Sequence, residues 1–425
     1  MEEITTPQLL ELLDDPEVKI IDVRPTEAYN GWRNKGEKRG GHIKTAKSLP
    51  LKWTSYFDWP EIVKEKKIRP ADRLVIYGYN RDEAQKVASL FLRAGYQNLS
   101  LYDHFLHHWD KDHNLPVSKL TRYKQLVSPA WLRQLISDGT ASGFNSERYC
   151  ICHCYYRDSG SYDKGHIPGA VPLDTNSLES PITWNRKTPE EIKTALEQLG
   201  ITHDTTVVLY GTYSFPRNDD PFPGSSAGHL GAMRCALLML YAGVEDVRLL
   251  NGGFQAWTDE GFEISKEHTT PRAVASFGIT VPKYPHLMID TEEARKYLQS
   301  EDKNLVCVRS WSEYIGEVSG YNYIKKRGRI PGAVFADCGS DAYHMENYRN
   351  PDHTTREFGE IHSMWANSGI TKDKHNAFYC GTGWRGSEAF VNAWLMGWKN
   401  ISVYDGGWYE WSSDETNPTE TGVPD

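Results

Sequence analysis

The strongest constraint in this 425-residue sequence is a pattern that occurs three times. Each copy opens with a short apolar run near an arginine, at residues 19–25, 148–157 and 305–311. A turn of small residues follows (GHIKTA, GHIPGA or GRIPGA), and then a second apolar run (RLVIYGYN, TTVVLYGTY or NAFYCGTGW). A helical stretch and an aromatic segment complete each copy. Units of this length are ordinary single domains, so the sequence predicts three domains of one fold.

The apolar runs also indicate the fold class. They are rich in β-branched residues and apolar on both faces, as expected of parallel strands buried in a sheet. Each second run is followed by a segment with helical periodicity, which predicts an α/β domain with a central parallel sheet and helices on both faces. We expect the domains at residues 1–125, 126–276 and 277–425. Pro271 and Pro282 lie near the second boundary and suggest an extended connector there.

The composition argues against some classes of binding partner. The net charge of −9 argues against a nucleic-acid partner, because such proteins carry a basic surface. No run of about 18 apolar residues is present, so no membrane partner is expected. Seven scattered cysteines favour free thiols and a cytoplasmic location, although a periplasmic one would follow if a signal peptide had been removed. The start MEEITTPQLL itself lacks the features of such a peptide.

The position after the second apolar run differs between the copies. Gly78 and Gly211 occupy it in the first two, and a long insertion at 212–231 follows Gly211. Cys380 occupies it in the third. Ligands bind at this carboxyl edge of parallel strands, so the third copy alone places a nucleophile where a ligand is expected.

The loop after Cys380 favours a reactive thiolate. Gly381 and Gly383 permit tight backbone turns, which let several amide groups point towards one anion. A helix begins directly afterwards, and its N-terminus also favours negative charge. Arg385 adds a permanent cation. The alternative is that Cys380 is a small residue filling the core, as most buried cysteines are.

The spacing within the loop bears on the reaction type. A phosphatase loop of the Cys-x5-Arg type needs arginine six positions after the cysteine, and Gly386 stands there instead. The loop is therefore one residue short for a tetrahedral phosphate. A smaller group on the sulfur fits this loop better.

These features resemble the rhodanese family of sulfurtransferases. They are the Asp-x-Arg strand end (Asp22 and Arg24), the GHIPGA turn, the CGTGWR loop and the YDGGWYEW segment. The resemblance covers the whole chain and implies three tandem rhodanese-like domains, of which the first two lack the cysteine. It further implies that Cys380 takes a sulfane sulfur from a small anionic donor, becomes a persulfide without any cofactor, and passes the sulfur to cyanide or a thiol.

The resemblance also implies roles for other residues. The loop amides would stabilise the persulfide charge, and Arg385 would orient thiosulfate as the donor. Three further arginines are weaker candidates for donor binding. The substrate-binding candidates are thus Gly381, Thr382, Gly383, Trp384 and Arg385, with Arg309, Arg349 and Arg356 as the weaker ones.

Several alternatives remain open at this point. The CG-x-G opening resembles enzymes that use 3-mercaptopyruvate as the donor. A persulfide carrier between protein partners would use the same cysteine, and a non-catalytic scaffold or a phosphatase fits less well. The stretch CICHC invites a metal interpretation, but alternation along a strand would direct His153 away from the three cysteines, so no metal site is expected.

Overall fold

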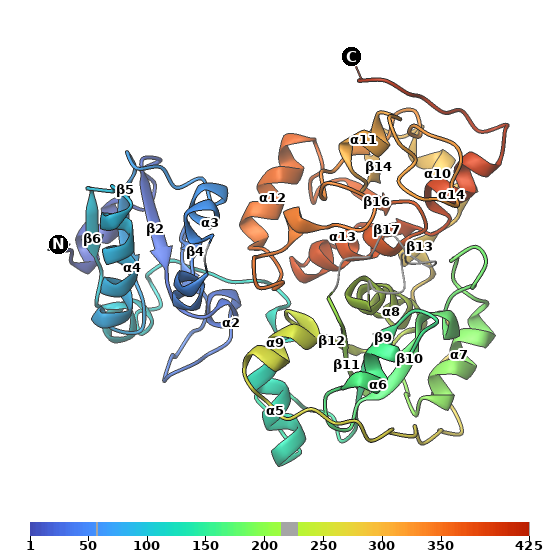
Figure 1. Ribbon diagram of the computed structural model, residues 1–425, viewed down its shortest axis with the longest axis horizontal. Coiled ribbons are helices and arrows are strands. Elements are labelled where there is room, and N and C mark those ends of the chain that lie inside the picture. The colour runs from blue at the N-terminus through green and yellow to red at the C-terminus, as the bar shows by residue number, and fades with distance from the viewer. Residues whose placement is uncertain (57, 214–227, 425) are drawn as a thin grey trace. The chain divides into compact units, whose positions relative to one another are not determined.

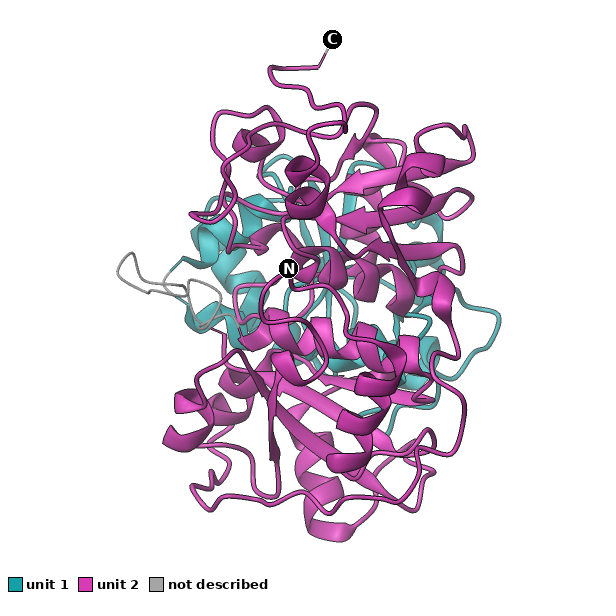
Figure 2. Cartoon of the chain, turned by 90° about the vertical axis from the view of Figure 1, so that its right-hand side faces the viewer, with its two compact units in different colours: residues 1–124 teal, residues 125–425 magenta. Residues whose placement is uncertain are grey.

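The computed structural model describes residues 1–56, 58–213 and 228–424, so most of the insertion at 212–231 lies outside the described residues. The chain forms two compact units, residues 1–124 and 125–425, shown in teal and magenta in Figure 2. The second and third sheets both belong to the larger unit. The boundary expected near Phe277 therefore separates two sheets within one compact unit.

The unit 1–124 contains one five-stranded parallel sheet with the order β1-β6-β5-β2-β4. Its central strands are buried, and aromatic and aliphatic side chains from both faces form its core. A short antiparallel pair, β3 with β7, lies beside it. The strands are β1 (Glu2–Glu3), β2 (Val18–Asp22), β3 (His42–Ile43), β4 (Lys47–Ser48), β5 (Arg73–Tyr77), β6 (Leu99–Leu101) and β7 (Val117–Ser118).

The two sheets of the larger unit repeat this order. The second reads β8-β12-β11-β9-β10 and the third β13-β17-β16-β14-β15, with all neighbours parallel. The second sheet contains β8 (Leu126–Val127), β9 (Tyr149–Tyr155), β10 (Val171–Asp174), β11 (Thr206–Gly211) and β12 (Asp246–Leu250). The third contains β13 (Met288–Ile289), β14 (Lys303–Cys307), β15 (Val334–Phe335), β16 (His375–Tyr379) and β17 (Ile401–Tyr404).

Helices cover both faces of the sheets (Figure 1). This confirms the α/β class expected from the sequence. The helices of the unit 1–124 are α1 (Thr6–Glu11), α2 (Thr26–Asn30), α3 (Trp59–Glu65) and α4 (Arg81–Arg93). Those beside the second sheet are α5 (Pro129–Asp138), α6 (Gly160–Lys164), α7 (Pro189–Gln198), α8 (Gly228–Ala242) and α9 (Gly253–Asp259). Those beside the third are α10 (Thr291–Tyr297), α11 (Trp311–Tyr314), α12 (Phe358–Asn367), α13 (Trp384–Leu395) and α14 (Gly407–Ser413).

Helices α8 and α13 join the two halves of the larger unit. They pack against each other between the second and third sheets (Figure 1). Every residue of α8 is buried, and so is every residue of α13 except Trp394. The sequence of α8 is apolar nearly all round, which is the pattern of a helix enclosed on all sides. Helix α13 also buries polar side chains, including Arg385 and Glu388. Since α13 begins directly after the Cys380 loop, this packing brings the second domain close to that loop.

The segment before the third sheet also packs against the second domain. Phe277 is fully buried, its carbonyl accepts a hydrogen bond from the His203 amide at 3.0 Å, and the Val274 amide donates to the Glu197 carbonyl at 2.9 Å. The proline-rich stretch expected as a connector is thus fixed along the surface of α7 and the turn after it.

The CICHC stretch forms the buried strand β9. The sulfurs of Cys150 and Cys152 lie 3.7 Å apart, which places these two side chains on one face. Among the residues that the structure describes, no group of three histidine, cysteine or acidic side chains is arranged to hold a metal ion. Within the same residues, no helix has the length and apolar character needed to span a membrane.

Candidate active site

Cys380 follows strand β16 at the carboxyl edge of the third sheet, and its side chain is fully buried. The chain turns at Gly383, whose φ of +94° is a left-handed conformation that favours glycine, and α13 begins at Trp384. Gly381 is required for another reason: a Cβ atom there would lie 2.2 Å from the ring of Tyr321. The two glycines thus allow the loop to turn tightly beneath an aromatic side chain.

Backbone hydrogen bonds hold the loop from the other side. The Trp408 amide donates to the Cys380 carbonyl at 2.8 Å, and the Tyr409 amide donates to the Gly381 carbonyl at 2.9 Å. Both donors lie at the start of α14, in the YDGGWYEW segment. The Ser387 amide and hydroxyl both donate to the Gly383 carbonyl, at 2.8 and 2.7 Å. The first amides of α13 have no partner within the helix, so they and the helix dipole favour an anion beside Cys380.

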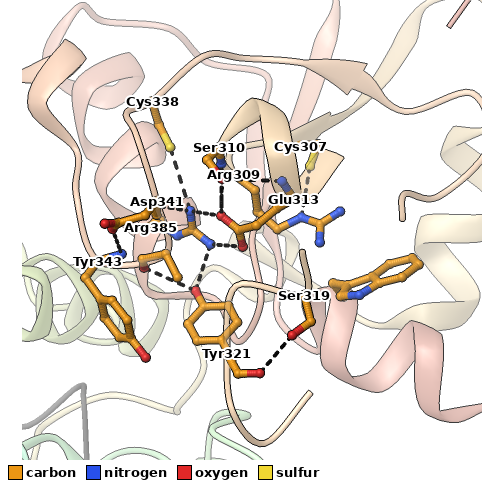
Figure 3. A network of polar contacts seen from close by, with 12 residues as sticks. Cys307, Arg309, Ser310, Glu313, Ser319, Tyr321, Cys338, Asp341, Tyr343 and Arg385 are labelled. Carbon is orange, nitrogen blue, oxygen red and sulfur yellow. Dashed lines mark hydrogen bonds and ion pairs between the residues drawn. The ribbon is translucent and has the colours of Figure 1, made fainter. Parts of the chain in front are cut away.

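The Arg385 side chain points towards Glu313 and Tyr321. Its two terminal nitrogens donate to the two carboxylate oxygens of Glu313 at 2.9 and 2.8 Å, and both residues are buried (Figure 3). The same guanidinium donates to the Tyr321 hydroxyl at 2.8 Å and to the Asp341 carbonyl at 3.1 Å. Arg385 was expected to orient an anionic donor, but its charge is balanced here by Glu313.

Arg309 lies in the same buried region. Its Nε donates to the Cys307 sulfur at 3.2 Å and its NH2 to the Gly328 carbonyl at 2.6 Å. Burial opposes the ionisation of Glu313, yet the positive charges of Arg385 and Arg309 hold its pKa below the usual value. Two buried guanidinium groups therefore face one carboxylate, and the local charge is positive.

The first domain contains the same position with an acid in it. Asp22 pairs in register with Tyr77, as Cys307 pairs with Tyr379. There the Arg24 guanidinium donates to both Asp22 oxygens, at 2.9 and 2.5 Å, and the Tyr77 hydroxyl donates to Asp22 at 2.6 Å. The third domain has exchanged this carboxylate for a thiol, which leaves Arg309 without the negative partner that Arg24 has.

A series of aromatic rings lies beside the loop. Tyr321 neighbours Tyr323 and Tyr343, with ring centroids 5.2 and 5.9 Å away. Trp184 of the second domain stacks on Tyr323 at 4.6 Å, and Tyr409 lies 5.6 Å from Trp184. These five residues, the aromatic series, are partly exposed. They connect the solvent-facing side of the larger unit with the buried loop.

Two phenol groups of this series, those of Tyr321 and Tyr323, are held in the neutral form. Burial raises the pKa of Tyr321 well above its usual value, although Arg385 acts to lower it. Burial likewise raises the pKa of Tyr323, although a hydrogen bond with the buried Thr382 side chain acts to lower it. A phenol that keeps its proton at neutral pH can serve as a hydrogen-bond or proton donor.

The other predicted arginines lie in ion pairs of their own. Arg349 is buried against Glu388 of α13, with an N–O distance of 2.5 Å. Arg356 pairs with Glu360 of α12 at 2.6 Å. Each guanidinium is neutralised within its domain, so the contacts of neither residue connect it with a sulfur donor at Cys380.

The cysteine slot has different surroundings in the other two domains. A Cβ atom on Gly78 would meet a Val23 methyl group at 2.8 Å. On Gly211 it would lie 2.1 Å from the Gly228 carbonyl oxygen, which is backbone. The second domain therefore encloses this position more tightly than the first.

Several residues at the site were not anticipated from the sequence. Glu313 could have been noticed, because Ser310 and Glu313 form a capping box that marks the start of α11. Tyr321 and Trp184 lie in irregular segments with no periodic pattern. Nothing in the local sequence indicates that they meet the loop.

Comparison with known proteins places the chain. Residues 5–112, 128–260 and 290–414 match the rhodanese-like domain. The thiosulfate sulfurtransferase YnjE of Escherichia coli is 39% identical over 99% of this chain and 93% of its own length. The sulfur carrier protein TtuD of Thermus thermophilus is 32% identical over 68% of this chain and 93% of its own. The solved structure of wild-type EanB is 58% identical, covers 100% of this chain and 98% of its own, and superposes with a TM-score of 0.98.

Further structures of EanB contain hercynine or ergothioneine, and one contains a cysteine persulfide in a tetrahedral intermediate state with ergothioneine. The EanB variants in these structures change that cysteine, a threonine two positions after it, and a tyrosine 59 positions before it. They also change two cysteines 73 and 42 positions before it. Residues of the same types stand at the same spacings in this chain: Cys380, Thr382, Tyr321, Cys307 and Cys338.

The family match covers more than half of the chain, and its three segments coincide with the three sheets. The nearly full-length similarity to a sulfurtransferase agrees with that match. This chain therefore belongs to the rhodanese family of sulfurtransferases, with three rhodanese-like domains in tandem.

Proposed function

We propose that this chain transfers a sulfane sulfur from a persulfide on Cys380 to the imidazole ring of hercynine, giving ergothioneine. The observation that carries the proposal is the agreement in type and spacing between five residues of this chain and those changed in EanB. The five residues lie in or near the Cys380 loop, and this chain is 58% identical to EanB overall. The acceptor expected from the sequence, cyanide or a simple thiol, is thereby replaced by a heteroaromatic ring carbon.

The reaction balances without a metal or an organic cofactor. In the first step, the Cys380 thiolate attacks the outer sulfur of a donor such as thiosulfate, the sulfur–sulfur bond breaks, and sulfite leaves with the electron pair. In the second step, the ring carbon between the two imidazole nitrogens loses its proton to water and bonds to the outer sulfur of the persulfide. The persulfide bond then breaks, and Cys380 leaves as a thiolate. The carbon is oxidised by two electrons and the sulfane sulfur is reduced by two.

The loop supports the first step. The backbone amides of residues 381–385 and the N-terminus of α13 would stabilise the negative charge on the persulfide. The excess positive charge of Arg309 and Arg385 over Glu313 acts in the same direction. In this proposal, Arg385 shapes the loop through Glu313 and Tyr321 and is not the direct ligand of the donor.

Tyr321 supports the second step. Its hydroxyl oxygen accepts a hydrogen bond from Arg385 and lies 3.5 Å from the Ala342 carbonyl oxygen, which is long for a hydrogen bond that the hydroxyl donates. The phenol can therefore turn this hydrogen towards a substrate nitrogen. Its raised pKa keeps it protonated, so Tyr321 is suited to hydrogen-bond or protonate an imidazole nitrogen, which makes the proton on the ring carbon easier to remove.

The aromatic series supports recognition of the rest of hercynine. Hercynine carries a permanent trimethylammonium group, and such cations bind to the faces of aromatic rings. Trp184, Tyr323 and Tyr409 form a cluster of three rings within contact of one another. We assign the trimethylammonium group to this cluster, with the imidazole towards Tyr321.

The test separates the two steps. The protein is incubated with thiosulfate, and intact mass spectrometry determines whether Cys380 gains one sulfur atom. Hercynine is then added, and ergothioneine is measured by liquid chromatography with mass spectrometry. We expect both signals in the wild type and neither in Cys380→Ser, with Cys235→Ala as a control cysteine in the second domain. A persulfide without any ergothioneine would refute the proposed acceptor.

A second candidate retains thiosulfate as the donor but uses another acceptor. The 39% identity to the E. coli thiosulfate sulfurtransferase and the similarity to a sulfur carrier protein favour it. Cyanide, a small thiol or a partner protein would then remove the sulfur from Cys380. Rates of thiocyanate formation that exceed those of ergothioneine formation would support this candidate, and loading by 3-mercaptopyruvate in place of thiosulfate would identify the alternative donor.

A further inference from the structure

The second domain reaches into the Cys380 loop through a buried group of charges. Arg234 lies on α8, which is mostly apolar and fully buried. Its Nε donates to Glu179 at 2.9 Å, and its NH2 donates to Asp405 at 2.6 Å and to the Trp184 carbonyl at 2.7 Å. A buried guanidinium is costly unless it is paired and hydrogen-bonded, and Arg234 meets this requirement with one acid from each domain.

Trp384 connects this group with one end of the loop. Its indole N–H donates to both oxygens of Glu179, at 3.0 and 3.1 Å. The ring also packs edge-on against Tyr156 at 5.4 Å and lies next to Gly231 of α8. The loop residue that stands four positions after Cys380 is therefore fixed by side chains of the second domain.

Asp405 connects the same group with the other side of the loop. Arg234 and Arg186 both donate to this carboxylate, which follows β17. Three residues later, the Trp408 amide donates to the Cys380 carbonyl, and the Tyr409 amide donates to the next carbonyl. A shift of Asp405 would therefore displace the backbone that holds the loop in place.

The remaining nitrogen of Arg234 faces the turn itself. Its NH1 would lie 3.1 Å from a Cβ atom on Gly383, and it has no hydrogen-bond partner among the described residues. The guanidinium thus contacts the turn between Cys380 and α13 directly. A side chain at Gly383 would crowd this nitrogen, and the φ of +94° there also favours glycine.

We infer that Glu179 and Arg234 of the second domain are positioning residues for the Cys380 loop. They do not touch the reacting sulfur: Glu179 acts through Trp384, and Arg234 acts through Asp405 and Gly383. This gives the second domain, which carries Gly211 in place of the cysteine, a defined part in the reaction. The inference rests on the proposed role of Cys380, and it is independent of which acceptor takes the sulfur.

The decisive experiment is a double-mutant cycle between Glu179→Ala and Trp384→Phe. The rate of iodoacetamide reaction at Cys380, followed by peptide mass spectrometry, reports loop geometry without any sulfur donor. kcat and KM for thiosulfate are measured in parallel. Each single variant should lower the alkylation rate and kcat by about 10- to 100-fold, the effect of misplacing a reacting group by about 1 Å. The double variant should be no slower than the slower single one, because both changes break the same contact.

Two further variants keep the test informative. Arg248→Met removes a buried ion pair of the same domain, formed with Asp246 at 2.8 Å, and should lower stability without changing Cys380 alkylation. Glu179→Gln retains an acceptor for the indole N–H and should recover most of the rate. If Glu179→Ala does not fold, Arg234→Lys replaces it. This variant keeps the positive charge but cannot make the separate hydrogen bonds of the guanidinium to Glu179, Asp405 and Trp184, so it should slow alkylation of Cys380.

The inference is overturned if the effects of Glu179→Ala and Trp384→Phe multiply, or if both match Arg248→Met. The proposed function can fail separately. In that case the wild type gains no sulfur from any donor, while the alkylation cycle still reports whether the second domain positions the loop.

Discussion

Arg385 and Glu313 form a two-pronged ion pair, with nitrogen–oxygen distances of 2.8 and 2.9 Å, beneath the loop that carries Cys380. The arginine comes from the first turn of α13 and the acid from α11, so the pair joins two elements on opposite sides of the third sheet's carboxyl edge. Since neither side chain is exposed, the pair functions as a buried internal support of the loop.

Removing the acid of this pair should destabilise the protein strongly. Glu313→Ala leaves Arg385 and Arg309 buried without a carboxylate, and breaking a buried pair in this way costs about 3–5 kcal/mol. The free energy of unfolding, from urea denaturation followed by circular dichroism, measures this. Glu292→Ala removes an exposed pair with Lys296 in the same domain and should change the free energy by no more than about 1 kcal/mol. Equal losses in the two variants would contradict the prediction.

Removing one hydroxyl should separate sulfur loading from sulfur transfer. Tyr321→Phe keeps the ring that packs on Gly381 but cannot donate a proton to the acceptor. We expect Cys380 to load with sulfur at a rate near that of the wild type. Ergothioneine formation should fall by about 10²- to 10⁴-fold, the usual contribution of a general acid. Single-turnover assays from a preloaded persulfide measure the second rate directly, and an equal decline of both rates would exclude this role.

The stability of the larger unit should depend on pH through Glu179. Burial raises the pKa of this carboxyl to about 7 from its usual 4.5, although Arg234 and Trp384 act to lower it. A group that binds its proton more tightly in the folded state stabilises the fold below its unfolded pKa. That contribution is lost as the pH rises through about 7.

Glu179→Gln provides the comparison for this titration. Tyr156 and Cys235 also face Glu179, but both keep raised pKa values, and Asp405 reaches it through Arg234. Between about pH 5 and pH 8, the wild type should lose stability relative to Glu179→Gln, by on the order of 3 kcal/mol. Urea denaturation across this range measures the difference. Parallel curves for the two proteins would show that Glu179 does not titrate in this window.

Replacing Cys307 by aspartate, the residue at the equivalent position of the first domain, should stabilise the protein and lower the reactivity of Cys380. Cys307→Asp gives Arg309 the kind of partner that Arg24 has in Asp22. Hydrogen bonds to charged groups contribute about 1.5–3 kcal/mol, so the free energy of unfolding should increase. The same substitution cancels the excess positive charge near the loop, so iodoacetamide should react more slowly with Cys380. Cys307→Ser, which adds no charge, should change neither quantity in this way.

Much of the fold was accessible from the sequence because the repeat aligns its strands. Once β14 and β16 are placed, the carboxyl edge and the position of Cys380 follow from parallel topology. Helix starts were equally local: the side chain of Asp290 caps α10, and that of Ser128 caps α5. These features depend on neighbours within a few residues, which is the range over which sequence patterns carry information.

The residues that surround the Cys380 loop could not be predicted from local sequence patterns. Glu179 meets Trp384 across 205 residues of sequence, and Trp184 meets Tyr323 from an irregular segment of another domain. Such contacts result from the packing of α8 on α13, and no periodicity encodes them. For the same reason, the sequence did not indicate that Arg385 pairs with Glu313, which lies 72 residues earlier.

The close contact between Gly211 and the Gly228 backbone limits how the second domain can evolve. A cysteine at this position would collide with the Gly228 backbone, so a single codon change could not give the second domain a working thiol. A return to activity would first require the backbone around Gly228 to move, and α8 begins there. Helix α8 also carries Arg234, which holds the neighbouring domain's loop. A change that made room for a cysteine at position 211 would therefore move α8 and disturb the Cys380 loop, which this helix supports through Arg234.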